Sequence, residues 1–392
     1  MTGQPHLVHG MGKDPAEPAW PPLTDDEVRE VLAGWVVTGA GDLAGGGDRP
    51  AVTWRSPRPM SAAALVCWGA VTVFLKRHHV RVRNPAQLAA EHAYALHLRR
   101  RGQPVPVVLH RANGQSVLSR GDFCYEVHQR ADGADLYRDA VSWSPYASSG
   151  HAHAAGRALA ALHLAAADFP GPARPFAMLT NSCRLICAAD PRAEADRLIG
   201  ECPELSGYLA GRRWAEDFTA WLLPLIRRAA PRARALPGQW GHGDWHPSNL
   251  TWTSAEPGAQ VCGIFDFGLA NRTFAVHDLA IALERTVVRW LDLDPVTGPG
   301  TAGTDLDAAA ALLDGYQEVR SLTGAEAAAL PAVLPVVHLE YALSEGAYFT
   351  SVTGSAADAD LAYEYLTGHA RWFSQPEGAE LLAFLGQHLR RA

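Results

Sequence analysis

Short apolar, β-rich runs mark the first third of the chain, and a helical period of apolar residues follows beyond it. Near the N-terminus, Thr24 and Glu27 form a capping box that predicts a helix over 25–35, and Asn84 followed by Pro85 predicts another that ends at Gly102. Short apolar runs between Gly, Pro and Ser residues predict strands at 51–55, 62–68, 70–76, near 107, at 116–119 and at 123–129. We interpret the first three strands as an antiparallel meander.

From about residue 136 the sequence becomes rich in Ala and Leu at helical spacing. The pattern predicts helices over 150–167, 190–198, 213–230, 276–291, 307–320, 326–350 (broken near two prolines), 356–372 and 377–390. A short β-like segment, 239–267, interrupts them. The expected fold class is therefore α+β, with a small β-rich lobe and a larger, mainly helical lobe. We assign a disordered tail to residues 1–22, the N-lobe to 23–130 and the C-lobe to 131–392.

The amino-acid composition and net charge disfavour several classes of binding partner. The 392 residues include 34 basic and 41 acidic ones, a formal charge of -7, so no basic surplus is present to bind nucleic acid or an anionic membrane. The six Cys residues have no repeated spacing, and no uncharged run has the length and composition of a spanning helix or a signal peptide. We expect a cytoplasmic protein with reduced thiols and without nucleic-acid or membrane partners.

The acidic residues are concentrated in the second half of the chain. Up to position 235 there are 27 basic and 22 acidic residues, and beyond it 7 basic and 19 acidic ones. An acidic cleft favours a cationic small molecule, such as an amino sugar, amino alcohol or amino acid. The candidate contacts are Glu340, Glu345, Asp358, Asp360 and Glu364, each of which could equally belong to a solvated helix face.

Two Gly-containing segments carry the candidate chemistry. The first, His-Gly-Asp-Trp-His-Pro-Ser-Asn, runs from His242 to Asn249 and contains Asp244, and the second, Gly-Ile-Phe-Asp-Phe-Gly, contains Asp266. One carboxylate can face an acceptor hydroxyl, while an amide and a second carboxylate supply the oxygen ligands that Mg²⁺ prefers. Phosphoryl transfer requires this combination of positioning and charge neutralisation.

Both segments resemble those of the aminoglycoside phosphotransferase and choline kinase superfamily, small-molecule kinases with a two-lobed, protein-kinase-like fold. The resemblance implies that Asp244 is the catalytic base, that Asn249 and Asp266 bind Mg²⁺, and that His242 is structural. It also implies that Asp278 buttresses the catalytic loop.

Lys76 is one of only two lysines in the chain, so its position at the end of a predicted strand favours a specific role over that of a surface cation. Glu91 lies on the helix that follows and is the only acid between Asp48 and Asp122. The resemblance implies a Lys76–Glu91 pair that holds the α- and β-phosphates of a nucleotide, because a carboxylate fixes a flexible ammonium.

The rest of the nucleotide site is less similar to the family. The loop 56–61 contains no Gly, so Ser61 or Arg58 would have to contact phosphate, and the choice between ATP and GTP stays open. The segment 126–131 is the expected hinge between the lobes, where the backbone at Gln129 and Ala131 would read the base.

Only about ten residues separate Asp266 from the helix containing Asp278, which is too short for the platform that protein kinases use to bind peptides. We therefore expect no protein substrate, and a Mg²⁺-dependent transfer of the γ-phosphate of ATP, or GTP, to a hydroxyl of a small molecule. The alternative is a nucleotide-binding, non-catalytic regulatory protein, which the loop without Gly favours. The pairs 78–79 and 151/153 are histidines that we expect to face solvent, without a metal.

Overall fold

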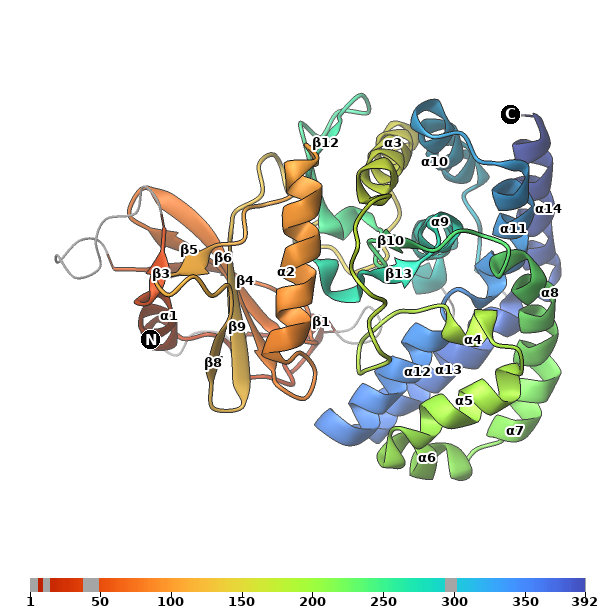
Figure 1. Cartoon of the computed structure of the whole chain (residues 1–392), viewed down its shortest axis with the longest axis horizontal. Helices are drawn as coiled ribbons and strands as arrows, with labels where there is room; N and C mark the ends of the chain where they lie inside the picture. Colours follow the sequence, from red (N-terminus) through yellow and green to blue (C-terminus); the bar gives the residue numbers. More distant parts are fainter. Residues whose placement is uncertain (1–5, 10–14, 38–48, 293–301, 392) are drawn as a thin grey trace.

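The computed structural model describes residues 6–9, 15–37, 49–292 and 302–391. Figure 1 shows a lobe built around a β-sheet and a larger helical lobe, with helix α2 (Pro85–Arg100) lying between them. The two-lobed α+β architecture predicted from the sequence is therefore confirmed.

The N-lobe is organised by a five-stranded antiparallel sheet of order β4-β5-β6-β9-β8. Its strands are β4 (Ala51–Arg55), β5 (Ala62–Trp68), β6 (Val71–His79), β8 (Leu118–Arg120) and β9 (Phe123–Gln129). Three of them have the predicted bounds. Strand β6 continues beyond Lys76 to His79, so this lysine lies inside the strand, opposite Glu126 of β9.

The two faces of this sheet have different partners. On one face Val73, Leu75 and Val127 are fully buried against α1 (Asp25–Leu32). Because side chains alternate along a strand, Lys76, His78 and the neighbouring side chains of β9 lie on the opposite face, towards α2. Helix α2 turns Tyr94, Ala95 and Leu98 into the core of the C-lobe and so joins the two lobes.

The described part of the first 22 residues is folded, which corrects the prediction of a disordered tail. Strand β1 (Val8–His9) pairs with β2 (Pro15–Ala16), and Val8 is 3% exposed. The Trp20 indole donates a hydrogen bond to the Tyr348 hydroxyl of the C-lobe at 3.1 Å and stacks on His79. Burial of aromatic and aliphatic side chains orders this Pro-rich segment. Residues 1–5 and 10–14 lie outside the described part.

Two further short strands, β3 (Trp35–Val36) and β7 (His110–Arg111), pair with each other.

The C-lobe helices surround α9 (Ala275–Thr286), in which every residue is buried. The others are α3 (Ser149–Ala166), α4 (Arg184–Cys187), α5 (Pro191–Gly200), α6 (Pro203–Ala210), α7 (Trp214–Asp217), α8 (Leu223–Ala233), α10 (Leu306–Val319), α11 (Gly324–Val333), α12 (Leu339–Tyr348), α13 (Ala356–Trp372) and α14 (Pro376–Arg391). The predicted break between α11 and α12 occurs at a 3₁₀ turn, Leu334–Val336. Helices α4 and α6 were not predicted.

One stretch of the described helices, Gly324–Thr353, is long and apolar enough to span a membrane, but 78% of its most apolar window is buried inside the C-lobe. It forms helices of the core, which explains its composition.

Candidate functional site

Two small hairpins bring the chemical residues together. Strand β10 (Gln239–Gly241) pairs with β13 (Asn271–Thr273), and β11 (Leu250–Trp252) pairs with β12 (Val261–Ile264). In the second hairpin Leu250 lies opposite Ile264, and the Phe265 amide donates to the Asn249 carbonyl at 3.1 Å. Asn249 and Asp266 therefore lie next to each other, as the predicted metal site requires.

Asp278 holds the loop that carries Asp244. Its buried carboxylate accepts hydrogen bonds from the backbone amides of His242 (2.5 Å) and Gly243 (2.6 Å) and from His163 Nε2 (3.1 Å). Burial alone would raise the pKa of Asp278, but these donors lower it, so the carboxylate is ionised. Gly243 has φ +76°, and an added Cβ would lie 2.1 Å from the Leu269 carbonyl oxygen, so only glycine fits this turn. The predicted buttress is therefore present.

His242 braces the same loop. It is fully buried, its Nε2 donates to the Phe265 carbonyl at 2.9 Å, and its Nδ1 accepts from the Asp244 amide at 3.2 Å. Because burial lowers the pKa of His242, the ring is neutral and links the two site segments by hydrogen bonds. The structural role expected for His242 agrees with these contacts.

Asp244 is 18% exposed, and Asn249 orients it. The Asn249 Nδ2 donates to the Asp244 carbonyl oxygen at 2.9 Å and to Oδ2 at 3.1 Å. His246 accepts a bond from the same nitrogen at 3.2 Å, and burial lowers the pKa of His246 to about 3, so it is neutral. Since the amide nitrogen is used within the loop, Oδ1 of Asn249 is the atom that a cation would take.

Lys76 pairs with Asp266, 190 residues further along the chain. The Nζ atom lies 3.1 Å from both Asp266 oxygens. Burial would raise the pKa of Asp266, but the nearby ammonium outweighs it and lowers that pKa to about 2. Asp266 has a left-handed backbone, φ 61°, and its Oδ1 accepts from the Gly268 amide at 3.4 Å. Such a conformation is costly for a residue other than glycine and is typical of functional sites.

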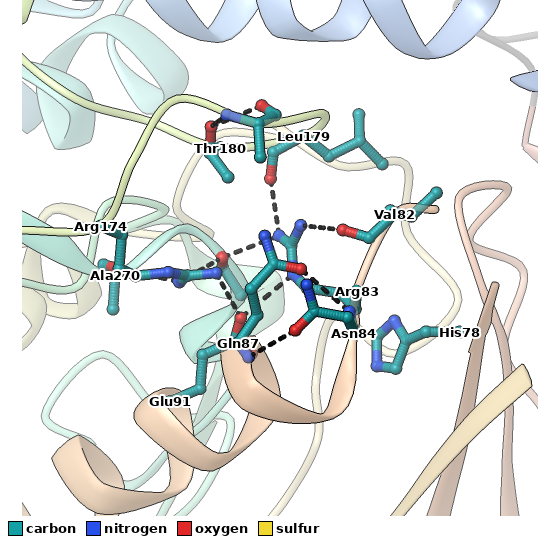
Figure 2. Close-up of polar contacts among 12 residues, drawn as sticks. His78, Val82, Arg83, Asn84, Gln87, Glu91, Arg174, Leu179, Thr180 and Ala270 are labelled. Carbon is teal, nitrogen blue, oxygen red and sulfur yellow. Dashed lines mark hydrogen bonds and ion pairs between the residues drawn. The ribbon is translucent and has the colours of Figure 1, made fainter. Parts of the chain in front are cut away.

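The structure corrects the predicted partner of Glu91. Figure 2 shows this carboxylate against Arg174 and Arg83, at 2.6 Å and 3.1 Å, with all three side chains buried. Both guanidinium groups also donate to the Gly268 carbonyl, at 2.9 Å and 2.8 Å. Glu91 therefore joins α2 to the loop after Asp266 through two arginines and does not contact Lys76. Neither arginine follows from a local sequence pattern, so only the fold reveals them.

The remaining predicted nucleotide contacts lie in two other segments of the chain. Arg58, in the loop between β4 and β5, donates to the Ala140 carbonyl of the C-lobe at 2.6 Å. Ser61, from the same loop, is half-buried. Gln129 ends β9, its amide donating to the Val107 carbonyl at 2.9 Å, and Ala131 follows where the chain enters the C-lobe. Arg58 and Ala131 therefore lie where the N-lobe meets the C-lobe.

Arg285 is the most important residue that sequence reasoning missed. It is 2% exposed on α9, and its guanidinium group forms an ion pair with Asp244. The rings of Trp143 and Tyr341 lie 5.3 Å and 5.2 Å from its central carbon, a cation–π arrangement. The predicted helix carries several other charged residues, so no sequence signal singled out Arg285, and only the burial of every residue of α9 reveals it.

Of the five acids proposed to contact a cationic acceptor, Glu345 has the best placement. It is 3% exposed, its Oε1 accepts from the Tyr341 hydroxyl at 3.3 Å, and its Oε2 has no hydrogen-bond partner among the described residues. Burial raises the pKa of Glu345 to about 7. Glu340 instead bonds to the Leu185 amide at 2.7 Å, and Asp360 pairs with Arg212, which are structural contacts.

Comparison with known proteins gives the family. Residues 65–340 match the Phosphotransferase enzyme family, APH. The chain belongs to this family. It is a small-molecule kinase that transfers phosphate to a hydroxyl group, as the sequence predicted.

Several relatives share moderate identity with this phosphotransferase. An uncharacterised protein of Deinococcus radiodurans is 29% identical over 78% of the chain and 79% of that protein. A homoserine kinase of Mesorhizobium japonicum is 33% identical over 46% of the chain and 47% of its own length, and one of Beijerinckia indica is 30% identical over 63% and 65%. The chain thus spans about half to two thirds of these homoserine kinases.

Solved structures share the fold at lower identity. A microcompartment-associated aminopropanol kinase superposes with a TM-score of 0.60 at 18% identity, over 91% of this chain and all of that one. An amicoumacin kinase in complex with AMP-PNP, Ca²⁺ and Ami gives a TM-score of 0.54 at 14% identity, over 93% of this chain and 92% of that one. These likenesses establish the protein-kinase-like fold of this phosphotransferase.

Proposed function

We propose that this phosphotransferase moves the γ-phosphate of Mg²⁺-bound ATP to the hydroxyl of a small hydroxy amino acid. The observation that carries the proposal is the convergence of Asp244, Asn249, Asp266 and Lys76 on one site, with Arg285 beside the candidate base. Residues 23–130 would bind the nucleotide and 131–392 the acceptor. A solved structure with the same fold contains AMP-PNP, an ATP analogue, which favours ATP as the phosphate donor. GTP stays open as the alternative donor.

The nucleotide side of the site is strongly charged. Burial lowers the pKa of Lys76, but Asp266 and Glu126 more than compensate and raise it, so Nζ is a permanent cation for the α- and β-phosphates. Asp266 and Oδ1 of Asn249 fit the hard-oxygen preference of Mg²⁺, whose charge would neutralise the transferring phosphoryl group. Arg58 and Ser61 would contact phosphate, and the backbone at Gln129 and Ala131 would read the base.

Asp244 would act on the acceptor. In the transfer, the hydroxyl oxygen forms a bond to the γ-phosphorus, the bond from that phosphorus to ADP breaks, and the hydroxyl proton moves to an Asp244 oxygen. Asn249 holds the carboxylate in place by its bond to Oδ2, and Asp278 fixes the loop that presents it.

Arg285 favours an acceptor with a carboxylate. A guanidinium group binds a carboxylate in a planar, two-pronged manner, and here it lies between two aromatic rings next to the residue that receives the hydroxyl proton. The free oxygen of Glu345 would accept an ammonium group of the same molecule. A hydroxy amino acid has both charges, whereas an amino sugar or amino alcohol lacks the carboxylate. The similarity to homoserine kinases supports this choice.

The experiment is an acceptor screen that follows ADP formation with Mg²⁺ and ATP. Homoserine, serine, the matching amino alcohols without a carboxylate, and aminoglycosides are compared. We expect the hydroxy amino acids to have the highest kcat/KM. Turnover of amino alcohols at the same kcat/KM would refute the acceptor class, and absence of turnover with every acceptor despite nucleotide binding would favour the non-catalytic alternative.

Two variants separate the roles in this screen. Asp244→Asn should lower kcat by at least ~10²-fold for every acceptor. Arg285→Met should raise KM for the hydroxy amino acid by about 10- to 100-fold, the value of a hydrogen bond to a charged group, without raising KM for the amino alcohol. Equal KM changes for both acceptors would contradict the role of Arg285 in binding the carboxylate. Cytoplasmic location and the absence of protein, membrane and nucleic-acid partners are part of the same proposal.

A further inference from the structure

Three histidines converge on the buried carboxylate of Glu126 in the N-lobe. His92 Nε2 and His128 Nε2 lie 2.7 Å and 2.8 Å from Oε2, and His78 Nε2 lies 2.8 Å from Oε1. The ligand atoms of His92, Glu126 and His128 all lie within 4.8 Å of one another. The proposed phosphoryl transfer uses none of these three histidines, and it uses Glu126 only as a charge that raises the pKa of Lys76.

The cluster is assembled by the fold. His78 belongs to β6, His92 to α2, and Glu126 and His128 to β9. Glu126 and His128 are two residues apart on one strand, so both side chains lie on the face of the sheet that α2 covers. The buried positions of His78, 7% exposed, and His151, 1% exposed, overturn the prediction that these two histidines face solvent.

Two neighbouring groups orient the donors. The Ser116 hydroxyl lies 2.8 Å from His92 Nδ1, so this ring can keep a proton on Nδ1 and present Nε2 without one. His78 holds Oε1 of Glu126 and leaves Oε2 directed at the other two rings. A hydrogen-bonded imidazole and a hydrogen-bonded carboxylate are the usual supports around protein metal ligands.

The donor set suits zinc in number and spacing. Two imidazole nitrogens and one carboxylate oxygen at ~2.0–2.2 Å from the ion would stand roughly 3.3 Å apart in tetrahedral geometry. The existing His–Glu contacts would therefore open by about 0.6 Å as the metal replaces the shared protons. His128 is 23% exposed, which leaves a path for the ion and a place for a water ligand.

We propose that His92, Glu126 and His128 form a zinc site that joins α2 to β9, with Ser116 and His78 as its supporting groups. The site uses other residues than the candidate Mg²⁺ ligands Asn249 and Asp266. Lys76 links the two, because it lies opposite Glu126 in the sheet and pairs with Asp266. A bound ion would tie the helix that carries Glu91 to the strand that leads into the hinge.

The test uses Co²⁺ and Zn²⁺ as probes on the full chain after treatment with EDTA and desalting. Co²⁺ is titrated while its visible absorption is recorded, and Zn²⁺ is then added in competition. We expect one Co²⁺ per chain with the spectrum of a four- or five-coordinate ion, displaced by one equivalent of Zn²⁺. Absence of a stoichiometric spectral change would overturn the proposal.

The variants locate the site. His92→Gln and His128→Gln should weaken binding by at least ~10-fold, and Ser116→Ala by about 10-fold through the orientation of His92. His110→Gln, an exposed histidine of the same lobe, and Asp266→Asn should bind Co²⁺ as the wild type does. Thermal unfolding of each apo-variant checks that it is folded. Equal binding by His128→Gln and His110→Gln, or loss of binding in Asp266→Asn, would refute the site.

Discussion

Replacing Glu91 by Gln tests the network that joins the lobes. The change removes one negative charge and keeps the shape of the side chain, leaving two guanidinium groups, on Arg83 and Arg174, without their carboxylate. Breaking a buried ion pair by removing one partner typically costs about 3–5 kcal/mol. Arg174 keeps the Gly268 and Ala270 carbonyl oxygens, each at 2.9 Å, and the new amide oxygen can still accept one bond. We therefore expect a loss near 3 kcal/mol in the free energy of unfolding.

Chemical denaturation measures this loss, with Glu30→Gln as the matched control. Glu30 pairs with Arg120 on the surface, where the side chains are 57% and 53% exposed and solvent screens the pair, so its loss should barely change the free energy of unfolding. A loss below about 1 kcal/mol in Glu91→Gln, equal to the control, would refute the buried network.

A double-mutant cycle distinguishes the two possible partners of Glu91. Combined with Arg174→Met, Glu91→Gln should show a coupling energy of about 1–3 kcal/mol, because both residues form one contact. Combined with Lys76→Met, the two losses should add within about 0.5 kcal/mol. A larger coupling with Lys76 than with Arg174 would restore the pair expected from the sequence.

Three further outcomes test the site. Asp278→Asn should lower kcat by at least ~10-fold and stability by about 2 kcal/mol, because its amide cannot accept from three donors; wild-type kinetics would contradict the buttress. Glu345 has a pKa near 7 in the folded chain and 4.5 when unfolded, so its stabilising contribution is fully present below pH 4.5 and lost as the pH rises through 7. Glu345→Gln, which imitates the protonated form, should therefore gain stability relative to the wild type between pH 5 and 8, approaching about 3 kcal/mol in urea unfolding, and a difference independent of pH would refute this. Asn249→Ala should weaken ATP binding in calorimetry with Mg²⁺ but not with EDTA; equal losses in both would exclude a metal ligand.

The elements that local periodicity defines were predicted well. Strands β4, β5 and β9 and helix α13 have the predicted bounds, because each segment is an apolar run or a helical period bounded by turn or capping residues. The short strands near the N-terminus were missed, since two-residue pairings have no period. The contacts of Trp20 with Tyr348 and His79 show that a few large side chains can fold a Pro-rich segment against distant partners.

The catalytic loop was predictable for a different reason. Asp244 and Asn249 are five residues apart, and the hydrogen bonds between them stay within one turn, so the sequence segment contains most of its own geometry. The contact between Asn249 and Phe265 adds the second segment through one hairpin. A short loop that is held by its own hydrogen bonds therefore has a geometry that a local sequence motif is enough to predict.

The charged partners could not be predicted, because they come from distant parts of the chain. Lys76 meets Asp266 across 190 residues, and Glu91 meets Arg174 across 83. The sequence placed Glu91 on the correct helix. Its partner depends on the path of the Pro-rich segment around Arg174, and that segment has no periodic pattern from which its path could be predicted. This arrangement affects the candidate site. Glu91 supports the loop of Asp266 through two arginines that bind the Gly268 carbonyl, while Asp266 itself pairs with Lys76. The helix and the strand lysine are thus connected through the candidate metal ligand and not directly, so a perturbation of α2 should reach Asp266 before it reaches Lys76.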